Sequence, residues 1–244
     1  MNRALAAGAA GMAGQQAVLD SIAANLANLD TPGFRAARPE FAAFLTPDGR
    51  MVGPSEATPR TLFTQGRLDE TSNQYDLAID GEGLFQVVTP DGRTAYTRAG
   101  NFTPDAHGRL LLPNGAALAG VRLPAATTSV EVSGDGAVSA RVAGKPGSVT
   151  AGRIELHDFA DLDSLRLEAD GLFSATPAAG GSSEGRPGSG GFGHVKQRCL
   201  ERANVSVVDA MMSILNAQRA YEANAKTVQA ADEMLRLANN LERG

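Results

Sequence analysis

Two apolar rows with a seven-residue spacing, one near each end of the chain, most constrain what it can fold into. The N-terminal row is Leu5, Met12, Leu19 and Leu26, with Ile22 three residues after Leu19. The C-terminal row is Val207, Ile214, Tyr221, Val228 and Leu235, and alanines follow three residues later at 210, 217, 231 and 238. This spacing places apolar side chains along one side of a helix. Because more than 170 residues separate the two rows, the helices pair with each other or with neighbouring molecules.

Sequence signals mark where the first predicted helix stops and where the second starts. Pro32 disfavours helical geometry at Thr31, and Gly33 readily adopts a turn, so the first helix ends before this dipeptide. Ser206 followed by Asp209 is a variant of the capping box. The pattern therefore predicts a C-terminal helix from about residue 206 to residue 241.

The region between the helices changes to the pattern of β-structure. Asp-Gly pairs at 48–49, 80–81, 91–92, 135–136 and 170–171 separate short runs rich in Val, Ile, Thr and Phe. We therefore expect an α+β protein in which the terminal helices pair as a coiled coil and an antiparallel all-β domain is inserted between them. The predicted segments are an N-terminal axial helix with its turn (1–36), an extended connector (37–74), the β domain (75–177), a flexible Gly-rich linker (178–193) and the C-terminal axial helix (194–244).

Composition and charge exclude several classes of protein. The net charge of −5 argues against a nucleic-acid binder, because phosphate contacts require an excess of Lys and Arg. A single cysteine and three histidines exclude disulfide frameworks and make a structural zinc site a poor fit. No apolar run approaches the roughly 18 residues that a membrane span needs. The Ala- and Gly-rich N-terminus lacks the leucine-rich centre of a signal peptide, so no cleaved signal is expected.

Catalytic and cofactor-binding patterns are equally weak. Gly188, Gly190 and Gly193 match a dinucleotide-binding spacing, but no expected strand precedes them and a Gly-dense segment yields such matches by chance. Neither a nucleophile elbow nor a plausible Cys–His pair occurs, and the aspartates at 158, 161 and 163 lack the spacing of a calcium loop. We therefore expect no enzyme activity, no cofactor and no metal.

Four stretches make the family recognisable. They are SIAANLANLDTPGF at 21–34, DLAIDGEGLFQ at 76–86, AYTRAGNF at 95–102, and a C-terminal stretch that begins at Asn204, contains AQRAYE at 217–222 and ends at Leu235. These stretches occur in family order and resemble the flagellar basal-body rod and hook proteins. The resemblance implies an axial protein whose terminal helices pair in a tube with the β domain outside, exported without a cleaved signal through the flagellar type III channel.

The resemblance also implies partners. They are copies of the chain in a helical polymer, other rod proteins, hook or hook–rod junction proteins, the ring proteins around the rod where the cell has an outer membrane, and the export apparatus. Residues 191–193 and the AQRAYE block most resemble the distal rod, which gives the main prediction. The short segment of about 25 residues between Phe34 and Leu62 and the total length suit a proximal rod subunit instead.

Two further alternatives concern the helices. They could form an ordinary hairpin packed on the chain's own β domain, or the dimer stalk of a secreted module that binds a ligand through an acidic β domain. Asn25 and Asn28 could face either solvent or a neighbouring subunit. Under the main prediction, the assembly interface comprises Leu5, Met12, Leu19, Ile22, Asn25, Leu26, Asn28, Thr31, Pro32, Gly33, Phe34, Asn204, Val207, Ile214, Gln218, Tyr221, Val228 and Leu235.

Overall fold

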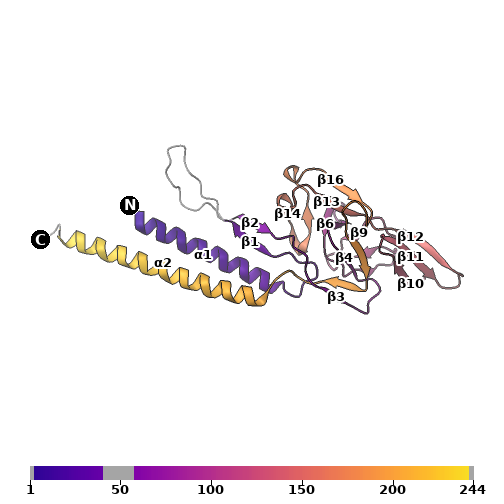
Figure 1. The fold of residues 1–244 in the computed structure, drawn as a ribbon, viewed down its shortest axis with the longest axis horizontal. Coiled ribbons are helices and arrows are strands. Elements are labelled where there is room, and N and C mark those ends of the chain that lie inside the picture. The colour runs from indigo at the N-terminus through magenta and orange to yellow at the C-terminus, as the bar shows by residue number, and fades with distance from the viewer. Residues whose placement is uncertain (1–2, 41–57, 242–244) are drawn as a thin grey trace. The chain divides into compact units, whose positions relative to one another are not determined.

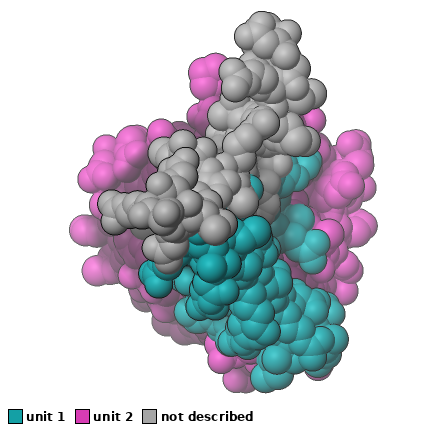
Figure 2. Space-filling model, turned by 90° about the vertical axis from the view of Figure 1, so that its left-hand side faces the viewer, with its two compact units in different colours: residues 1–27, 37–62, 205–244 teal, residues 28–36, 63–204 magenta. Residues whose placement is uncertain are grey.

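The computed structural model describes residues 3–40 and 58–241 (Figure 1). The chain divides into two compact units, coloured separately in Figure 2. Unit 1 comprises residues 1–27, 37–62 and 205–244, and unit 2 comprises residues 28–36 and 63–204. The architecture of helices at both ends with antiparallel β-structure between them confirms the α+β prediction. Both units are discontinuous in sequence, so each depends on contacts between distant segments.

Unit 1 is built on the two long helices, which lie side by side and run antiparallel (Figure 1). These are α1 (Arg3–Ala27) and α2 (Val207–Leu241), accompanied by the short antiparallel pair β1 (Ala37–Glu40) and β2 (Thr58–Thr61). The predicted start of the C-terminal helix is confirmed, because the Ser206 hydroxyl accepts the Asp209 N–H at 3.3 Å. The first helix ends at Ala27, a few residues before the Pro32 signal.

The helices approach closely because small residues line their contact. A Cβ built on Gly8 would lie 2.5 Å from the Val228 Cγ2 atom, so only glycine fits there without a shift. Ala217 and Ala231 are the most deeply buried residues of α2, at 3% and 2% exposure. The heptad row itself drifts: Leu26 is 37% exposed, and Ile22 is buried instead. A straight helix with 3.6 residues per turn departs by about 20° per heptad from a seven-residue repeat, which explains the drift.

Unit 2 is an antiparallel β domain. Its main sheet has the strand order β14-β15-β6-β5-β9-β8-β7, and β13 joins it by pairing with β5 and β16. A separate sheet has the order β10-β11-β12, and the pairs β17-β4 and β18-β3 complete the unit. The predicted Asp-Gly turns at 91–92 and 135–136 connect β5 to β6 and β10 to β11. The strands are β3 (Leu68–Glu70), β4 (Leu77–Asp80), β5 (Leu84–Val88), β6 (Thr94–Thr97), β7 (Thr103–Pro104), β8 (Leu110–Leu111), β9 (Ala117–Leu118), β10 (Thr127–Val132), β11 (Ala137–Val142), β12 (Ser148–Arg153), β13 (Leu156–Phe159), β14 (Arg166–Leu167), β15 (Phe173–Ser174), β16 (Ser182–Gly185), β17 (His194–Gln197) and β18 (Cys199–Glu201). Short 3₁₀ turns lie at Leu162–Ser164, Ala169–Gly171 and Pro177–Ala179.

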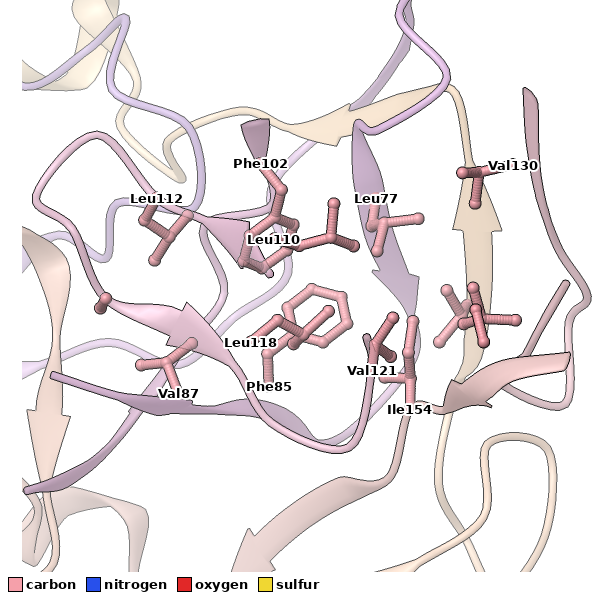
Figure 3. Close-up of a cluster of buried hydrophobic side chains, with 14 of the residues drawn as sticks. Leu77, Phe85, Val87, Phe102, Leu110, Leu112, Leu118, Val121, Val130 and Ile154 are labelled. Carbon is pink, nitrogen blue, oxygen red and sulfur yellow. The ribbon is translucent and has the colours of Figure 1, made fainter. Parts of the chain in front are cut away.

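The core of unit 2 gathers aliphatic and aromatic side chains from most of these strands (Figure 3). Phe85 and Phe102 are fully buried and meet edge to face, with ring centroids 5.9 Å apart. Leu77 and Ile79 of β4 contribute to the same cluster, as does Val195 of β17. This arrangement explains how a chain with few aromatic residues still builds a well-filled core.

Two expected segments differ from the structure. Residues 178–193 are not an unstructured linker, because β16 pairs with β13 and Phe192 packs against the core. Residues 194–201 form β17 and β18 rather than the start of a helix. The reason is tertiary: β4 needs a neighbour, and β17 supplies it while burying Val195. The expected connector at 37–74 includes residues 41–57, which lie outside the described residues, and its flanks form β1, β2 and β3.

The burial of His157 predicts that the stability of unit 2 depends on pH. The side chain is 3% exposed on β13, its ring lies 5.4 Å from the Tyr96 ring, and its Nδ1 atom has no hydrogen-bond partner among the described residues. Burial lowers the pKa of His157 below its ordinary value of 6.5, while nearby Glu155 opposes this effect. The unfolded chain therefore binds a proton at His157 more readily than the folded chain does.

We expect the protein to lose stability as the pH falls from about 7.5 through the ordinary histidine pKa toward the lowered folded value. His157→Gln should reduce that loss because glutamine does not titrate, whereas His107→Gln, at an exposed turn, should leave it unchanged. Urea unfolding at two pH values, followed by circular dichroism, measures the effect. An equal loss in wild type and His157→Gln would contradict the assignment.

Candidate functional site

The turn that follows the first helix, residues 28–36, has a tightly specified backbone. The Thr31 N–H donates to the Asn28 carbonyl at 3.1 Å, and the Phe34 N–H donates to the Thr31 carbonyl at 3.3 Å. Gly33 has φ +69°, and a Cβ on it would lie 2.3 Å from the Ala99 nitrogen. Both the conformation and the close approach therefore require glycine at this position.

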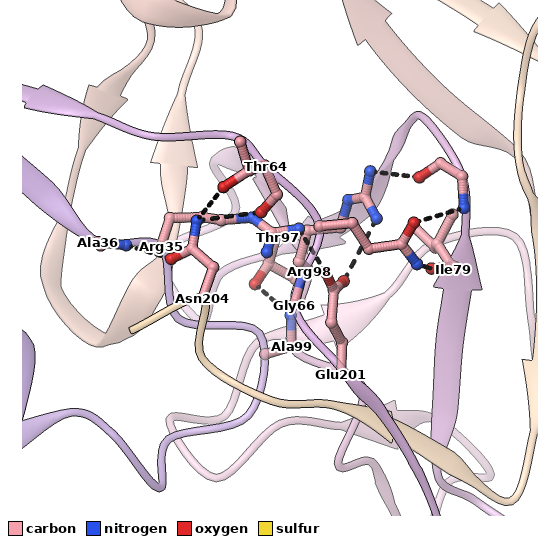
Figure 4. A network of polar contacts seen from close by, with 12 residues as sticks. Arg35, Ala36, Thr64, Gly66, Ile79, Thr97, Arg98, Ala99, Glu201 and Asn204 are labelled. Carbon is pink, nitrogen blue, oxygen red and sulfur yellow. Dashed lines mark hydrogen bonds and ion pairs between the residues drawn. The ribbon is translucent and has the colours of Figure 1, made fainter. Parts of the chain in front are cut away.

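This turn is held by residues that come just before α2. The Gly33 N–H donates to the Glu201 carbonyl at 2.7 Å, and the Ala36 N–H donates to Asn204 Oδ1 at 2.6 Å. The other end of the Asn204 amide donates to the carbonyl and the hydroxyl of Thr64, both at 3.0 Å. One asparagine side chain thus connects three segments of unit 2 that are far apart in sequence (Figure 4).

A buried cluster of three ions lies beside these contacts (Figure 4). Arg35 Nη2 is 2.8 Å from Glu201 Oε1, and Arg98 Nη1 is 3.3 Å from Glu201 Oε2. The side chains of Arg35 and Glu201 have no exposed surface, and that of Arg98 is 7% exposed. The Gly66 N–H also donates to Glu201 Oε1 at 2.8 Å, while Arg98 Nη2 donates to the Gly81 carbonyl at 2.7 Å. The cluster therefore connects the N-terminal turn, the residue that follows β6, and β18.

The cluster holds two guanidinium groups against one carboxylate. Burial, with a smaller effect from the nearby Arg35, lowers the pKa of Arg98 to about 10, although Glu201 opposes both effects. Arg98 therefore stays protonated at neutral pH. Such a cluster tolerates no loss of its single anion, because each cation would then remain buried without a counter-charge.

The structure brings several predicted interface residues together and separates others. Gly33, Phe34 and Asn204 meet at this site, since the Asn204 N–H also donates to the Phe34 carbonyl at 3.4 Å. Asn25 lies in unit 1 and binds both the N–H and the carbonyl of Ala37, at 2.9 and 2.8 Å. This contact within the chain is a third role that the two sequence-based alternatives for Asn25 did not include.

Asn28, Thr31 and Pro32 lie in the turn of unit 2, and the remaining predicted residues lie along the helices of unit 1. Gln218 and Tyr221 border a groove of about 390 Å³ together with Leu19 of α1. The side chain of Leu235 lies outside the description. Half-buried positions on the two helices are Leu5, Met12, Leu19, Val207, Ile214 and Val228.

Sequence reasoning missed the ion cluster. Arg98 lies inside the AYTRAGNF stretch and Arg35 directly follows the TPGF turn, so each lies in or next to a motif of the family resemblance. Their shared partner is 103 and 166 residues away, and no local pattern indicates a contact of that range. The signal that could have indicated the ion cluster is Arg98, a charged residue within the otherwise neutral AYTRAGNF motif.

The described residues do not point to catalysis. Across residues 3–40 and 58–241, no group of three His, Cys, Asp or Glu side chains is placed to hold a metal ion. Burial raises the pKa of the half-buried Cys199 thiol above its ordinary value, which disfavours the reactive thiolate. None of the described helices has the length and apolar character required to cross a membrane. The arrangement is suited to holding segments together.

Glu201→Gln should therefore destabilise unit 2 by about 3 to 5 kcal/mol, because it leaves two buried cations without an anion. Glu70→Gln is the matched control, since Glu70 is exposed on β3 and should leave the unfolding midpoint unchanged. Urea unfolding followed by circular dichroism compares the two variants with wild type. A Glu201→Gln midpoint equal to that of the control would show that the cluster contributes little.

Comparison with known proteins identifies the family. Three family models match: "Flagella basal body rod protein" at residues 5–35, "Flagellar hook protein FlgE/F/G D1 domain" at 78–140, and "Flagellar basal body rod FlgEFG protein C-terminal" at 196–241. The flagellar basal-body rod protein FlgG of Agrobacterium fabrum is 37% identical, over 95% of this chain and 96% of its own length. FlgG of Borreliella burgdorferi is 36% identical over the full length of both chains, and the rod protein FlgF of Salmonella typhimurium is 32% identical over 93% and 92%.

The matches cover the N-terminal helix with most of its turn, part of the β domain (78–140), and the last strands with the C-terminal helix, in the order in which the structure places them. The ion cluster draws one residue from each matched region: Arg35, Arg98 and Glu201. The chain belongs to the flagellar basal-body rod protein family.

Proposed function

We propose that this chain is a structural subunit of the bacterial flagellar rod, of the distal-rod type, and that it polymerises into a helical tube that transmits torque to the hook. The observation that carries the proposal is similarity along the whole chain to proteins named FlgG, at 36% and 37% identity. The relative named FlgF matches at 32% over slightly less of each chain, which favours the distal over the proximal alternative.

The helices support a role in the tube. In unit 1 they pack through glycine and alanine, which allows the backbones to approach closely and makes the pair narrow. We propose that the pair winds as a coiled coil and lines the tube, with the β domain outside. Stiffness in such a shaft comes from dense packing, and no covalent bond is made or broken.

The remaining inferences concern partners and location. The proposed partners are copies of this chain, other rod proteins, hook or hook–rod junction proteins, the surrounding ring proteins and the flagellar export apparatus. The proposed location is the basal-body rod, reached by export without a cleaved signal peptide. The family membership supports the rod as the location, and the negative net charge supports the absence of a nucleic-acid partner.

Val228→Asp tests whether the helix pair is needed for assembly. Val228 packs against Gly8, so the substitution buries a carboxylate among apolar groups or forces its protonation. In cells that lack their own copy of the gene, we expect the variant to leave the cytoplasm, to be absent from isolated basal bodies and to abolish motility. Gln229→Asp, the exposed neighbouring position, is the control and should support motility.

Three results would contradict the proposal. Normal basal bodies containing Val228→Asp would show that the helix pair does not hold the polymer together. Full motility of cells that lack the gene altogether would show that this chain is not needed in the rod, and would contradict the proposed function. Wild-type protein that stops at a small closed oligomer in sedimentation would favour the secreted binding module instead.

A further inference from the structure

The buried ion cluster of Arg35, Arg98 and Glu201 carries two positive charges and one negative charge (Figure 4). The side chains of Arg35 and Glu201 have no exposed surface, and that of Arg98 is 7% exposed, so water screens the excess charge poorly. Burial and the nearby Arg35 both lower the pKa of Arg98, and Glu201 does not fully offset them. Because a buried charge without a counter-charge is strongly unfavourable, the cluster favours a further anion.

Three guanidinium nitrogens of the cluster have no hydrogen-bond partner among the described residues. They are Nε and Nη1 of Arg35 and Nε of Arg98. Buried polar groups in proteins are almost always hydrogen-bonded, so three unpartnered donors in one cluster point to a bound acceptor. A guanidinium group donates hydrogen bonds and cannot accept them. The hydrogen-bonding pattern and the charge therefore agree on the same kind of ligand.

The acidic side chains near the cluster do not supply this acceptor. Both oxygens of Glu201 are engaged, because Oε1 accepts from Arg35 Nη2 and from the Gly66 N–H, each at 2.8 Å, and Oε2 lies 3.3 Å from Arg98 Nη1. Asp158 raises the pKa of Arg98 less than Glu201 does, and within residues 3–40 and 58–241 it forms no ion pair with either arginine. One Asp158 oxygen accepts the Phe159 N–H at 2.9 Å instead.

The surroundings of the cluster limit the ligand to a small monovalent ion. Arg35 carries two of the three unpartnered nitrogens, and its side chain has no exposed surface, so a bulky ligand cannot reach them. Arg98 also lines a pocket of about 400 Å³, where the other charged residues are Glu82, Asp158, Asp161 and Asp163. These carboxylates repel anions, and they repel a dianion more strongly than a monoanion. Chloride meets both conditions.

We propose that the cluster binds one chloride ion, held chiefly by the unpartnered N–H groups of Arg35. With one carboxylate and one chloride facing two guanidinium groups, the buried cluster is neutral. The chloride accepts the hydrogen bonds that the described side chains leave unmade. This inference stands on the ion cluster alone and does not depend on the proposed rod function.

Chloride binding is then linked to the docking of the N-terminal turn. Arg35 belongs to this turn, whereas Arg98 follows β6 and Glu201 ends β18. If the turn leaves, Arg98 and Glu201 remain as a balanced pair, and neither the excess charge nor the donors of Arg35 are left to hold the ion. A ligand that binds only one state stabilises that state, so chloride must stabilise the docked turn.

Urea unfolding of the full chain, followed by circular dichroism, tests the chloride site. Sodium gluconate is replaced by sodium chloride at constant ionic strength, so that screening of surface charges stays the same. Once chloride exceeds its Kd, we expect each further tenfold rise to increase the equilibrium constant for folding by about tenfold. Inorganic phosphate at the same ionic strength should give no such increase. An equal effect of phosphate would show a general salt effect and overturn the proposal.

Two arginine substitutions separate the cluster from the rest of the surface. Arg35→Met removes the excess charge and leaves Arg98 and Glu201 as a balanced pair, so we expect its folding constant to change by less than about twofold over the same chloride range. Arg141→Met removes an exposed arginine of β11 and should keep the wild-type dependence on chloride. A dependence in Arg35→Met equal to that of wild type would overturn the proposal.

Bromide in place of chloride locates the ion in the wild-type protein, so this measurement does not require any variant to fold. Crystals grown with sodium bromide should give an anomalous diffraction peak within hydrogen-bond distance of Arg35 Nε or Nη1. Peaks confined to the protein surface would mean an adventitious ion only, and would overturn the proposal. Wild-type stability that does not respond to chloride would overturn it as well.

Discussion

The carboxylate of Glu201, shared by the buried guanidinium groups of Arg35 and Arg98, joins three segments of unit 2 that are far apart in sequence. Burying three charges costs several kcal/mol per ion, and their attraction offsets that cost only when the geometry and hydrogen bonds are good. The Gly66 N–H and the Gly81 carbonyl supply part of those hydrogen bonds. The cluster thus contributes little to the net free energy of folding. Its main effect is to fix where the N-terminal turn docks, because a turn docked in any other position would leave a buried ion unpaired.

The position of this cluster in the chain matters for the helices. α1 ends at Ala27 and α2 begins at Val207, so Arg35 lies eight residues after the first helix and Glu201 lies six residues before the second. The backbone bonds from Gly33 to Glu201 and from Ala36 to Asn204 fix the two connecting segments against each other in unit 2. The two segments that lead to the helices are therefore held together within unit 2.

Local features of the fold were predictable from sequence because their causes are local. Ser206 caps α2 through a bond that spans three residues, and the Asp-Gly turns close hairpins a few residues long. The pairing of β17 with β4 was not predictable, because it depends on an open strand edge more than a hundred residues earlier. The Gly-rich segment was misread for the same reason: composition indicates flexibility, while β16 and Phe192 are ordered by partners that composition does not show. The ion cluster shares this limit, since each charged residue is unremarkable in its own neighbourhood.

α1 is a long helix although its glycines give it a weak intrinsic tendency to be helical. The small residues at its contact with α2 explain how it is stabilised. Each interior glycine costs about 1 kcal/mol of helix stability relative to alanine, and Gly8 and Gly11 both lie where α2 comes closest. The loss is offset only while α2 is in contact, so α1 is a helix that depends on its partner. An outer face made of alanine adds almost no side-chain entropy cost when a further helix packs on it. A helix of this composition is poorly suited to stand alone and well suited to be surrounded, which agrees with its proposed place inside a densely packed tube.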